Sequence, residues 1–145
     1  MEAVKLLPII PIIIVILTAG CIKEIEEALD PDLDMEVLSV HYINETDEGY
    51  TPISDHVWTV LTVNMTSHND KGSHPISVLK FFARTADGEW IWCRGYLGDD
   101  ELLLKPGESL LFDIYFEVHE SDKLVYLEYR HYVDGDPASA LIPDY

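Results

Sequence analysis

The sequence predicts an all-β protein, an antiparallel β-sandwich that begins near Met35. From this residue onward, short runs rich in Val, Ile, Tyr, Phe, Trp and Thr are separated by turn residues. The run Leu110–Val118 places Leu, Phe, Ile, Phe and Val at alternate positions, as a strand does when one of its faces covers a core. No segment after residue 35 has a clear helical period. These observations favour a sandwich over a helical or mixed fold.

Six segments have the composition of strands. They are Met35–Ile43, His56–Thr66, Ile76–Thr85, Glu89–Cys93, Leu110–Val118 and Lys123–His131, and turns are expected at Asn69–Gly72, Asp87-Gly88, Lys105–Gly107 and Asp134-Gly135. Asp87-Gly88 lies between two apolar runs and predicts a hairpin, because this dipeptide is preferred in two-residue β-turns. The pattern leaves open whether a seventh strand after His131 closes the sandwich.

The chain is short and strongly acidic. Its 145 residues include 27 Asp and Glu against 9 Lys and Arg, which gives a formal charge of −18, and 48% of them are hydrophobic. This length suits one domain with its own core, and the apolar content excludes intrinsic disorder. Binding to nucleic acid or to an anionic lipid surface needs clustered basic residues, so both are excluded. The acidity indicates a solvated surface, with binding of divalent cations or adaptation to a saline or acidic exterior as alternatives.

An apolar stretch near the amino terminus predicts export. Leu6–Ala19 is fourteen residues long and carries no charge, which matches a signal-peptide core and falls short of the about 20 residues that a spanning helix needs. The stretch ends in Leu-Thr-Ala-Gly-Cys at residues 17–21, which resembles the lipobox of prokaryotic lipoproteins. That resemblance implies a signal peptide over residues 1–20 and attachment of a diacylglycerol to Cys21. An uncleaved amino-terminal anchor is the alternative.

The residues after Cys21 are expected outside the membrane, whether the apolar stretch is a cleaved signal peptide or an uncleaved anchor. Residues 21–34 are expected to form a lipidated tether, and residues 35–145 the β-sandwich domain. The tether is either a short helix, because Ile22, Ile25 and Leu29 have helical spacing, or a flexible stalk. The expected location is the cell membrane, with the protein lipid-anchored and facing the extracytoplasmic side.

The order of strands and turns resembles a known class of domain. Its parts are an alternating strand and polar turn (Val57–Asn69), a strand and hairpin (Ser77–Gly88), the turn Leu104–Glu108 leading into Leu110–Val118, and a final strand (Leu124–Tyr129). This order resembles the immunoglobulin-like extracellular domains of unknown function found in bacterial and archaeal lipoproteins, which are related in fold to mycobacterial secreted antigens. The resemblance implies an immunoglobulin-like sandwich and an extracytoplasmic location, and it brings no catalytic residues.

No catalytic motif is recognisable. The sequence has neither a Gly-rich phosphate loop nor a Gly-x-Ser-x-Gly elbow. Cys93 follows Trp-Ile-Trp in an apparent strand, which is typical of a small buried hydrophobe, and nothing places a base beside it. We therefore expect no enzyme and no cofactor. The expected function is that of a lipid-anchored envelope protein whose domain acts by binding or by structural association.

A calcium- or metal-binding envelope protein is the alternative function. Calcium favours several carboxylate oxygens on a flexible loop, and acidic side chains gather in two places. The candidate ligands are Asp99, Asp100 and Glu101 in one place and Asp134 and Asp136 in the other. Neither group has a known calcium-loop spacing, and an ordinary charged turn is the simpler interpretation. His68 and His74 flank one loop and, with Asp70, could bind a transition metal.

Two further kinds of surface site are predicted. Asn44 and Asn64 each begin an Asn-x-Thr triplet, which is a glycosylation acceptor in an exported protein. The aromatic residues are too many for all to be buried, and Tyr115 with Tyr126 on an outward face could form a recognition patch for an envelope protein or a glycan. The alternative is that these aromatic side chains only cover the core.

Overall fold

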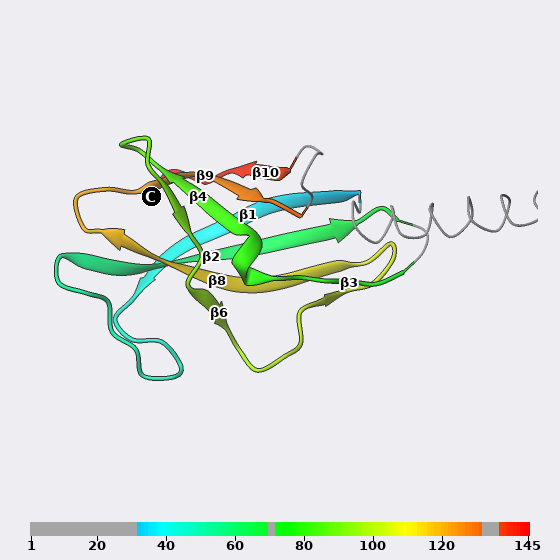
Figure 1. Ribbon diagram of the computed structural model, residues 1–145, viewed down its shortest axis with the longest axis horizontal. Coiled ribbons are helices and arrows are strands. Elements are labelled where there is room, and N and C mark those ends of the chain that lie inside the picture. The colour runs from blue at the N-terminus through cyan, green and yellow to red at the C-terminus, as the bar shows by residue number, and fades with distance from the viewer. Residues whose placement is uncertain (1–31, 70–71, 132–136) are drawn as a thin grey trace, which may run out of the picture.

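The computed structural model describes residues 32–69, 72–131 and 137–145 (Figure 1). The predicted signal peptide, Cys21, nearly all of the tether, the turn Asp134-Gly135 and the candidate ligands Asp134 and Asp136 lie outside these residues. The strands are β1 Leu33–Ile43, β2 His56–Ser67, β3 His74–Pro75, β4 Phe81–Thr85, β5 Trp90–Trp92, β6 Gly95–Leu97, β7 Leu103–Leu104, β8 Ser109–His119, β9 Leu124–Tyr129 and β10 Ala138–Leu141, with a 3₁₀ turn, η1, at Val78–Lys80. Within the described ranges, no helix has the length and hydropathy needed to cross a membrane.

Two four-stranded antiparallel sheets form the sandwich (Figure 1). The first sheet has the order β1-β2-β8-β6 and the second the order β10-β9-β4-β5, while β3 and β7 form a separate short pair. When the eight sandwich strands are lettered along the chain as A, B, C, C′, D, E, F and G, the sheets read A-B-E-D and G-F-C-C′. This is the strand arrangement of immunoglobulin domains with C′ added to the second sheet. The predicted all-β, immunoglobulin-like antiparallel β-sandwich is confirmed.

The core lies between the sheets and is built from alternate residues of the long strands. β2 and β8 pair over eleven residues, from His56 opposite His119 to Thr66 opposite Ser109. The buried side chains of the first sheet include Leu61, Val63, Met65, Phe112, Ile114 and Phe116, and those of the second include Phe81, Ala83, Leu127 and Tyr129. Burying one large apolar side chain contributes about 1.5–3 kcal/mol, so the alternation seen in the sequence is also the main source of stability.

The predicted strand Ile76–Thr85 is only half correct. The strand begins at Phe81, and the residues before it form η1, with the Lys80 N–H donating to the Ser77 carbonyl oxygen. The Ile76 N–H donates to Leu102 O and the Ser77 N–H to the Tyr129 hydroxyl, so the donors that a strand would use are satisfied in other ways. Apolar composition predicted the segment's burial without revealing that the chain turns there.

The end of β9 and three short strands also differ from the prediction. β9 ends at Tyr129 instead of His131, and β10 then pairs with β9 from Ala138 opposite Tyr129 to Leu141 opposite Tyr126. A further strand after His131 therefore completes this sheet. The short strands β3, β6 and β7 have two or three residues each and were not predicted, since so few residues carry no detectable alternation.

Two predicted turns are confirmed. The Asp87-Gly88 turn joins β4 to β5, and Gly88 has φ +90°. The Thr85 N–H donates to the Glu89 carbonyl oxygen at 2.8 Å, and the Gly88 N–H donates to the Thr85 carbonyl oxygen at 2.9 Å. The Lys105–Gly107 turn is closed by the Glu108 N–H donating to Lys105 O at 3.1 Å, and Gly107 has φ +71°. Glycine suits both places because side chains strain a backbone at positive φ.

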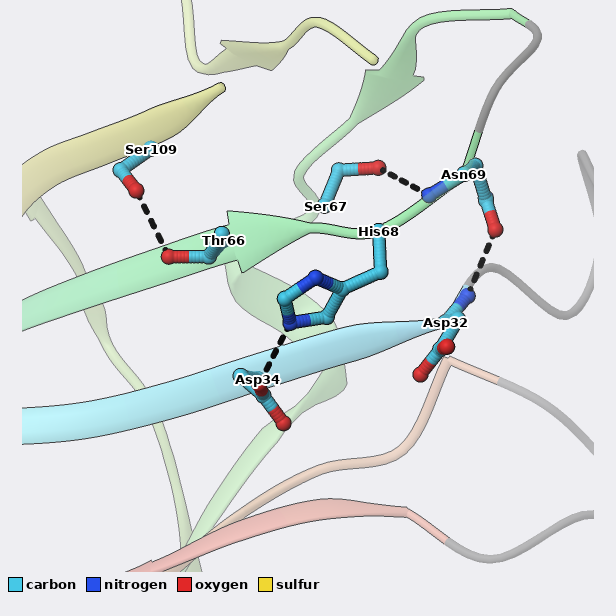
Figure 2. A network of polar contacts seen from close by, with 7 residues as sticks. All are labelled: Asp32, Asp34, Thr66, Ser67, His68, Asn69 and Ser109. Atoms are coloured by element: carbon cyan, nitrogen blue, oxygen red, sulfur yellow. Dashed lines mark hydrogen bonds and ion pairs between the residues drawn. The ribbon is translucent and has the colours of Figure 1, made fainter. Parts of the chain in front are cut away.

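Polar contacts connect the start of β1 to the residues at the end of β2 (Figure 2). The Asp32 N–H donates to Asn69 Oδ1 at 2.9 Å, and the His68 N–H donates to Asp32 O at 2.8 Å. Figure 2 also shows the His68 ring directed at the carboxylate of Asp34, where Nε2 lies 2.5 Å from Oδ2. These contacts are exposed, so each contributes at most about 1 kcal/mol, and together they fix where the chain enters the sandwich.

Candidate functional site

A groove lies on the outer side of the first sheet, beneath the loop that joins β1 to β2 (residues 44–55). It has a volume of about 480 Å³, within the usual range for small-ligand sites. Buried Trp58 and Tyr115 lie at its base, and the exposed side chains of Tyr50 and Ile53 form part of its rim. The remaining lining residues are Glu48, Thr51, Val78, Arg94, Gly95, Tyr96 and Glu117.

The base of the groove is a second, smaller core. Trp58, Val60 and Tyr115 alternate with the inward residues of β2 and β8, so they point away from the main core, yet they are at most 9% exposed. The rings of Trp58 and Tyr115 meet edge to face, with centroids 5.1 Å apart. Ile43 and Leu97 pack against this cluster. Apolar residues on both faces of β2 and β8 therefore explain why the β1–β2 loop covers the sheet here.

Hydrogen bonds hold the loop over the sheet. The Trp58 indole N–H donates to the Tyr50 carbonyl oxygen at 2.9 Å, and the Ile53 N–H donates to Glu117 Oε2 at 3.1 Å. Within the loop, the Thr46 N–H donates to Tyr50 O at 2.9 Å, while the Tyr50 N–H donates back to Thr46 Oγ1 at 3.1 Å. The groove is therefore preformed by contacts that join residues far apart in the chain.

The charged side chains of the groove are Arg94, Glu117 and Glu48. Arg94 Nη1 lies 3.9 Å from Glu117 Oε1, and the carboxylate is mostly buried while the guanidinium is half-exposed. Burial raises the pKa of the Tyr115 hydroxyl, and the neighbouring charge of Glu48 raises that pKa further. The phenol of Tyr115 therefore stays protonated, and the groove offers both hydrogen-bond donors and acceptors beside aromatic rings.

A second surface, the aromatic face, covers the outer side of the second sheet. Its members are Phe82 and Arg84 on β4, Trp90 and Trp92 on β5, Tyr126 and Glu128 on β9, Arg130 just after β9, and Leu141 on β10. Trp92 is 64% exposed and Leu141 is 79% exposed. The guanidinium of Arg130 lies 4.0 Å from the ring centroid of Phe82 and 5.0 Å from that of Trp90. Large apolar groups and cations thus share one solvent-facing surface.

The structure does not bring Tyr115 and Tyr126 together. Tyr115 belongs to the first sheet and is 9% exposed beneath the β1–β2 loop, whereas Tyr126 belongs to the second sheet and packs edge to face on Trp90 at 6.1 Å. The proposed joint patch is therefore wrong. Strand alternation correctly predicted that both rings point away from the core, but it carried no information on which sheet holds each strand or which loop covers it.

The predicted metal ligands that the structure describes do not gather. Within residues 32–69, 72–131 and 137–145, no three His, Cys, Asp or Glu side chains are placed to hold a metal ion. Asp99, Asp100 and Glu101 are exposed after β6. His74 is buried with Nε2 2.9 Å from the Tyr129 hydroxyl, and His68 instead contacts Asp34, so these two histidines do not share a site. Asp70 lies outside the described residues.

The glycosylation candidates occupy different environments. Asn44 is exposed at the start of the β1–β2 loop, although Thr46 of its triplet is buried. Asn64 is half-buried within β2, paired with Glu36 of β1 and Leu111 of β8. An acceptor on an exposed loop is the more accessible of the two, so Asn44 is the better candidate.

Cys93 is buried, as its sequence context predicted. Its thiol donates to the carbonyl oxygens of Gly95 at 3.2 Å and Tyr115 at 3.6 Å. Burial raises the thiol's pKa to about 12. A thiol that remains protonated at neutral pH is a poor nucleophile, and Cys93 therefore has the environment of a structural residue.

Fold and surfaces together define an immunoglobulin-like β-sandwich with a preformed groove and an exposed aromatic face. No family model matches the chain, and no curated protein matches it. Among solved structures, it is similar to the secreted protein MPT63 from Mycobacterium tuberculosis, with 19% sequence identity, a TM-score of 0.49, and alignment over 77% of this chain and 82% of that one.

Proposed function

We propose that the protein is a non-enzymatic binding protein of the cell envelope, anchored by lipid at Cys21 and facing the extracytoplasmic side. Two separate lines of support lead to this proposal. The lipobox-like residues 17–21 follow an apolar stretch of signal-peptide length, which supports export and anchoring. The aromatic face supports binding, and it is the single observation on which the binding function depends.

The composition of the aromatic face favours a protein partner. Trp, Tyr and Arg are the residues most enriched among those that dominate binding energy in protein interfaces, and Trp90, Trp92, Tyr126, Arg84 and Arg130 share this one surface. Arg130 is held over two rings, so little side-chain freedom is lost when a partner covers it. A single exposed apolar residue is ordinary, whereas a grouped set on one face of a sheet supports an interaction site.

The charges on the aromatic face indicate which surface of a protein partner it would bind. The molecule has a formal charge of −18, yet the aromatic face carries two arginines and one glutamate. An acidic surface patch on an envelope protein would meet favourable charges here and repulsion over the rest of the molecule. The face would therefore orient such a partner as well as bind it.

Photocrosslinking tests the binding function in intact cells. A photoreactive phenylalanine analogue placed at Trp92 or Leu141 of the full chain should give discrete, shared adducts with an envelope protein. The same analogue at Leu111, which is 60% exposed on the outer face of the first sheet, is the matched control. If positions 92 and 141 crosslink no more than position 111, the binding function assigned to the face is wrong.

Anchoring is tested separately. The native protein should carry acyl chains on the sulfur of Cys21 by mass spectrometry, and Cys21→Ser should move the chain out of the membrane fraction. An unmodified Cys21 thiol with the leader still attached would exclude lipidation and leave the uncleaved anchor as the explanation.

A further inference from the structure

The groove under the β1–β2 loop has features of a ligand site that the aromatic face does not explain. It lies on the opposite sheet and is lined by none of the residues that define that face. Its loop is fixed by hydrogen bonds from Trp58, Ile53 and Thr46, so the volume of about 480 Å³ is maintained without a ligand. A preformed site avoids the entropy cost of ordering a loop on binding.

The Tyr115 hydroxyl is available to a ligand. The side chain is 9% exposed, and among the described residues no hydrogen bond is made by its hydroxyl. The hydroxyl is not among the buried side-chain atoms that lack a partner in the described residues, so it is open to the groove, where a ligand can replace water. The hydroxyl lies at the base of the groove, beside Gly95. A ligand hydroxyl placed there could both accept from and donate to it.

The charged pair offers donors and acceptors side by side. Arg94 and Glu117 are 3.9 Å apart, a long separation that leaves the guanidinium able to turn its N–H groups toward a ligand. Glu117 already accepts from the Ile53 N–H through Oε2, and Oε1 faces Arg94. One donor group beside one acceptor group matches two adjacent hydroxyls of a sugar ring, each of which can donate and accept.

Charge and apolar surface narrow the ligand class. The charged groups that line the groove are one guanidinium, of Arg94, and two carboxylates, of Glu48 and Glu117. Because these groups sum to a negative charge and the whole chain has a formal charge of −18, an anionic ligand is repelled. A simple cation would be repelled by the positive charge of Arg94. The rings of Tyr50 and Tyr96 provide apolar surface of the kind that covers the C–H face of a sugar.

We propose that the groove binds one neutral saccharide unit, with Arg94 and Glu117 bonding adjacent hydroxyls, the Tyr115 hydroxyl bonding a third polar group, and the aromatic rim packing on the ring. None of the residues of the aromatic face lines this groove, but Arg94 and Glu117 also line a smaller cavity beside Trp90 and Trp92, so the two surfaces adjoin at this charged pair.

Nuclear magnetic resonance of the full chain in detergent micelles tests the proposal. The indole N–H of Trp58 bonds to the loop at the base of the groove, so its signal reports occupancy. Glucose, galactose, mannose and N-acetylglucosamine are titrated separately to about 100 mM, a range that detects weak, millimolar binding, with glucuronate as the anionic comparison. At least one neutral sugar should shift the signal saturably, and glucuronate should not.

Variants separate binding from general effects on the fold. Arg94→Ala should weaken the sugar's Kd about tenfold, and Tyr115→Phe, which removes only the hydroxyl, should weaken it about threefold to tenfold. Lys105→Ala removes one positive charge from an exposed turn far from the groove, and it should leave the Kd unchanged. The proposal is overturned if none of the four neutral sugars gives a saturable shift, if glucuronate binds more tightly than they do, or if Arg94→Ala binds as well as the unaltered protein.

Discussion

Tyr115 lies against the backbone of Gly95, its partner across β6 and β8. A Cβ atom built on Gly95 would be 2.5 Å from the Tyr115 hydroxyl oxygen and 2.8 Å from Cζ. Gly95 does not have a positive φ, so its backbone conformation does not require glycine. Glycine is needed here because a side chain would clash with the Tyr115 ring. The glycine gives the tyrosine room at the base of the groove, and the same two residues supply the carbonyl oxygens that accept from the Cys93 thiol.

Gly95→Ala should therefore destabilise the domain by about 1–3 kcal/mol, because the added methyl group forces the Tyr115 ring out of its packed position. Thermal unfolding measures the change. In a Tyr115→Ala background the same glycine substitution should cost clearly less, since the clashing ring is gone. Equal costs in both backgrounds would show that the close approach is not the cause.

Cys93 should be unreactive in the folded protein. In Cys21→Ser, where it is the one remaining cysteine, a thiol reagent at pH 8 should react only after denaturant is added, because burial keeps the thiol protonated. Rapid labelling under native conditions would contradict the buried position.

The Cys93 thiol also predicts how the free energy of unfolding changes with pH. The pKa of the Cys93 thiol rises from 9.0 to about 12 on folding, so the folded state holds the proton more tightly than the unfolded state. Its contribution to stability is present below pH 9 and is lost as the pH rises from 9 toward 12. Chemical denaturation at pH 8 and pH 10.5 should show this loss, and Cys93→Ala should lose less stability over that interval than the unaltered chain.

Tyr129→Phe should lower the free energy of unfolding by about 1–2 kcal/mol. The Tyr129 hydroxyl accepts from the Ser77 N–H at 3.2 Å and lies 2.9 Å from His74 Nε2, so its loss removes the link between β9 and the segments before η1. Tyr126→Phe is the matched control on the same strand, where the side chain is half-buried on the outer face of the sheet, and it should cost little. Similar losses in the two variants would contradict a specific role for the buried hydroxyl.

A chelator should leave the unfolding midpoint unchanged. Asp99, Asp100 and Glu101 are exposed, and the described residues contain no group of three metal-ligating side chains. A bound ion would raise the midpoint in proportion to the logarithm of its free concentration over Kd. A clear fall with chelator, restored by added calcium, would instead support the alternative of a calcium-binding envelope protein.

Local sequence patterns were sufficient to predict the long strands and their hairpin. The alternation in His56–Thr66 and Leu110–Val118 predicted β2 and β8 to within one residue at each end, and Asp87-Gly88 predicted the β4–β5 connection. These features depend on residues adjacent in the chain, since a strand's facing direction has a period of two and a tight turn is set by its own dihedral angles.

The surfaces were decided by tertiary structure. The loop over Trp58 and Tyr115 is held by a bond between Ile53 and Glu117, which are 64 residues apart, and the grouping of Trp92 with Leu141 depends on β5 and β10 joining the same sheet. An alternating strand specifies which side chains face away from the core, but not which neighbours or loops those side chains meet. The amino-acid sequence by itself thus determined an acidic, all-β sandwich, and only the folding together of distant segments created the groove and the aromatic face.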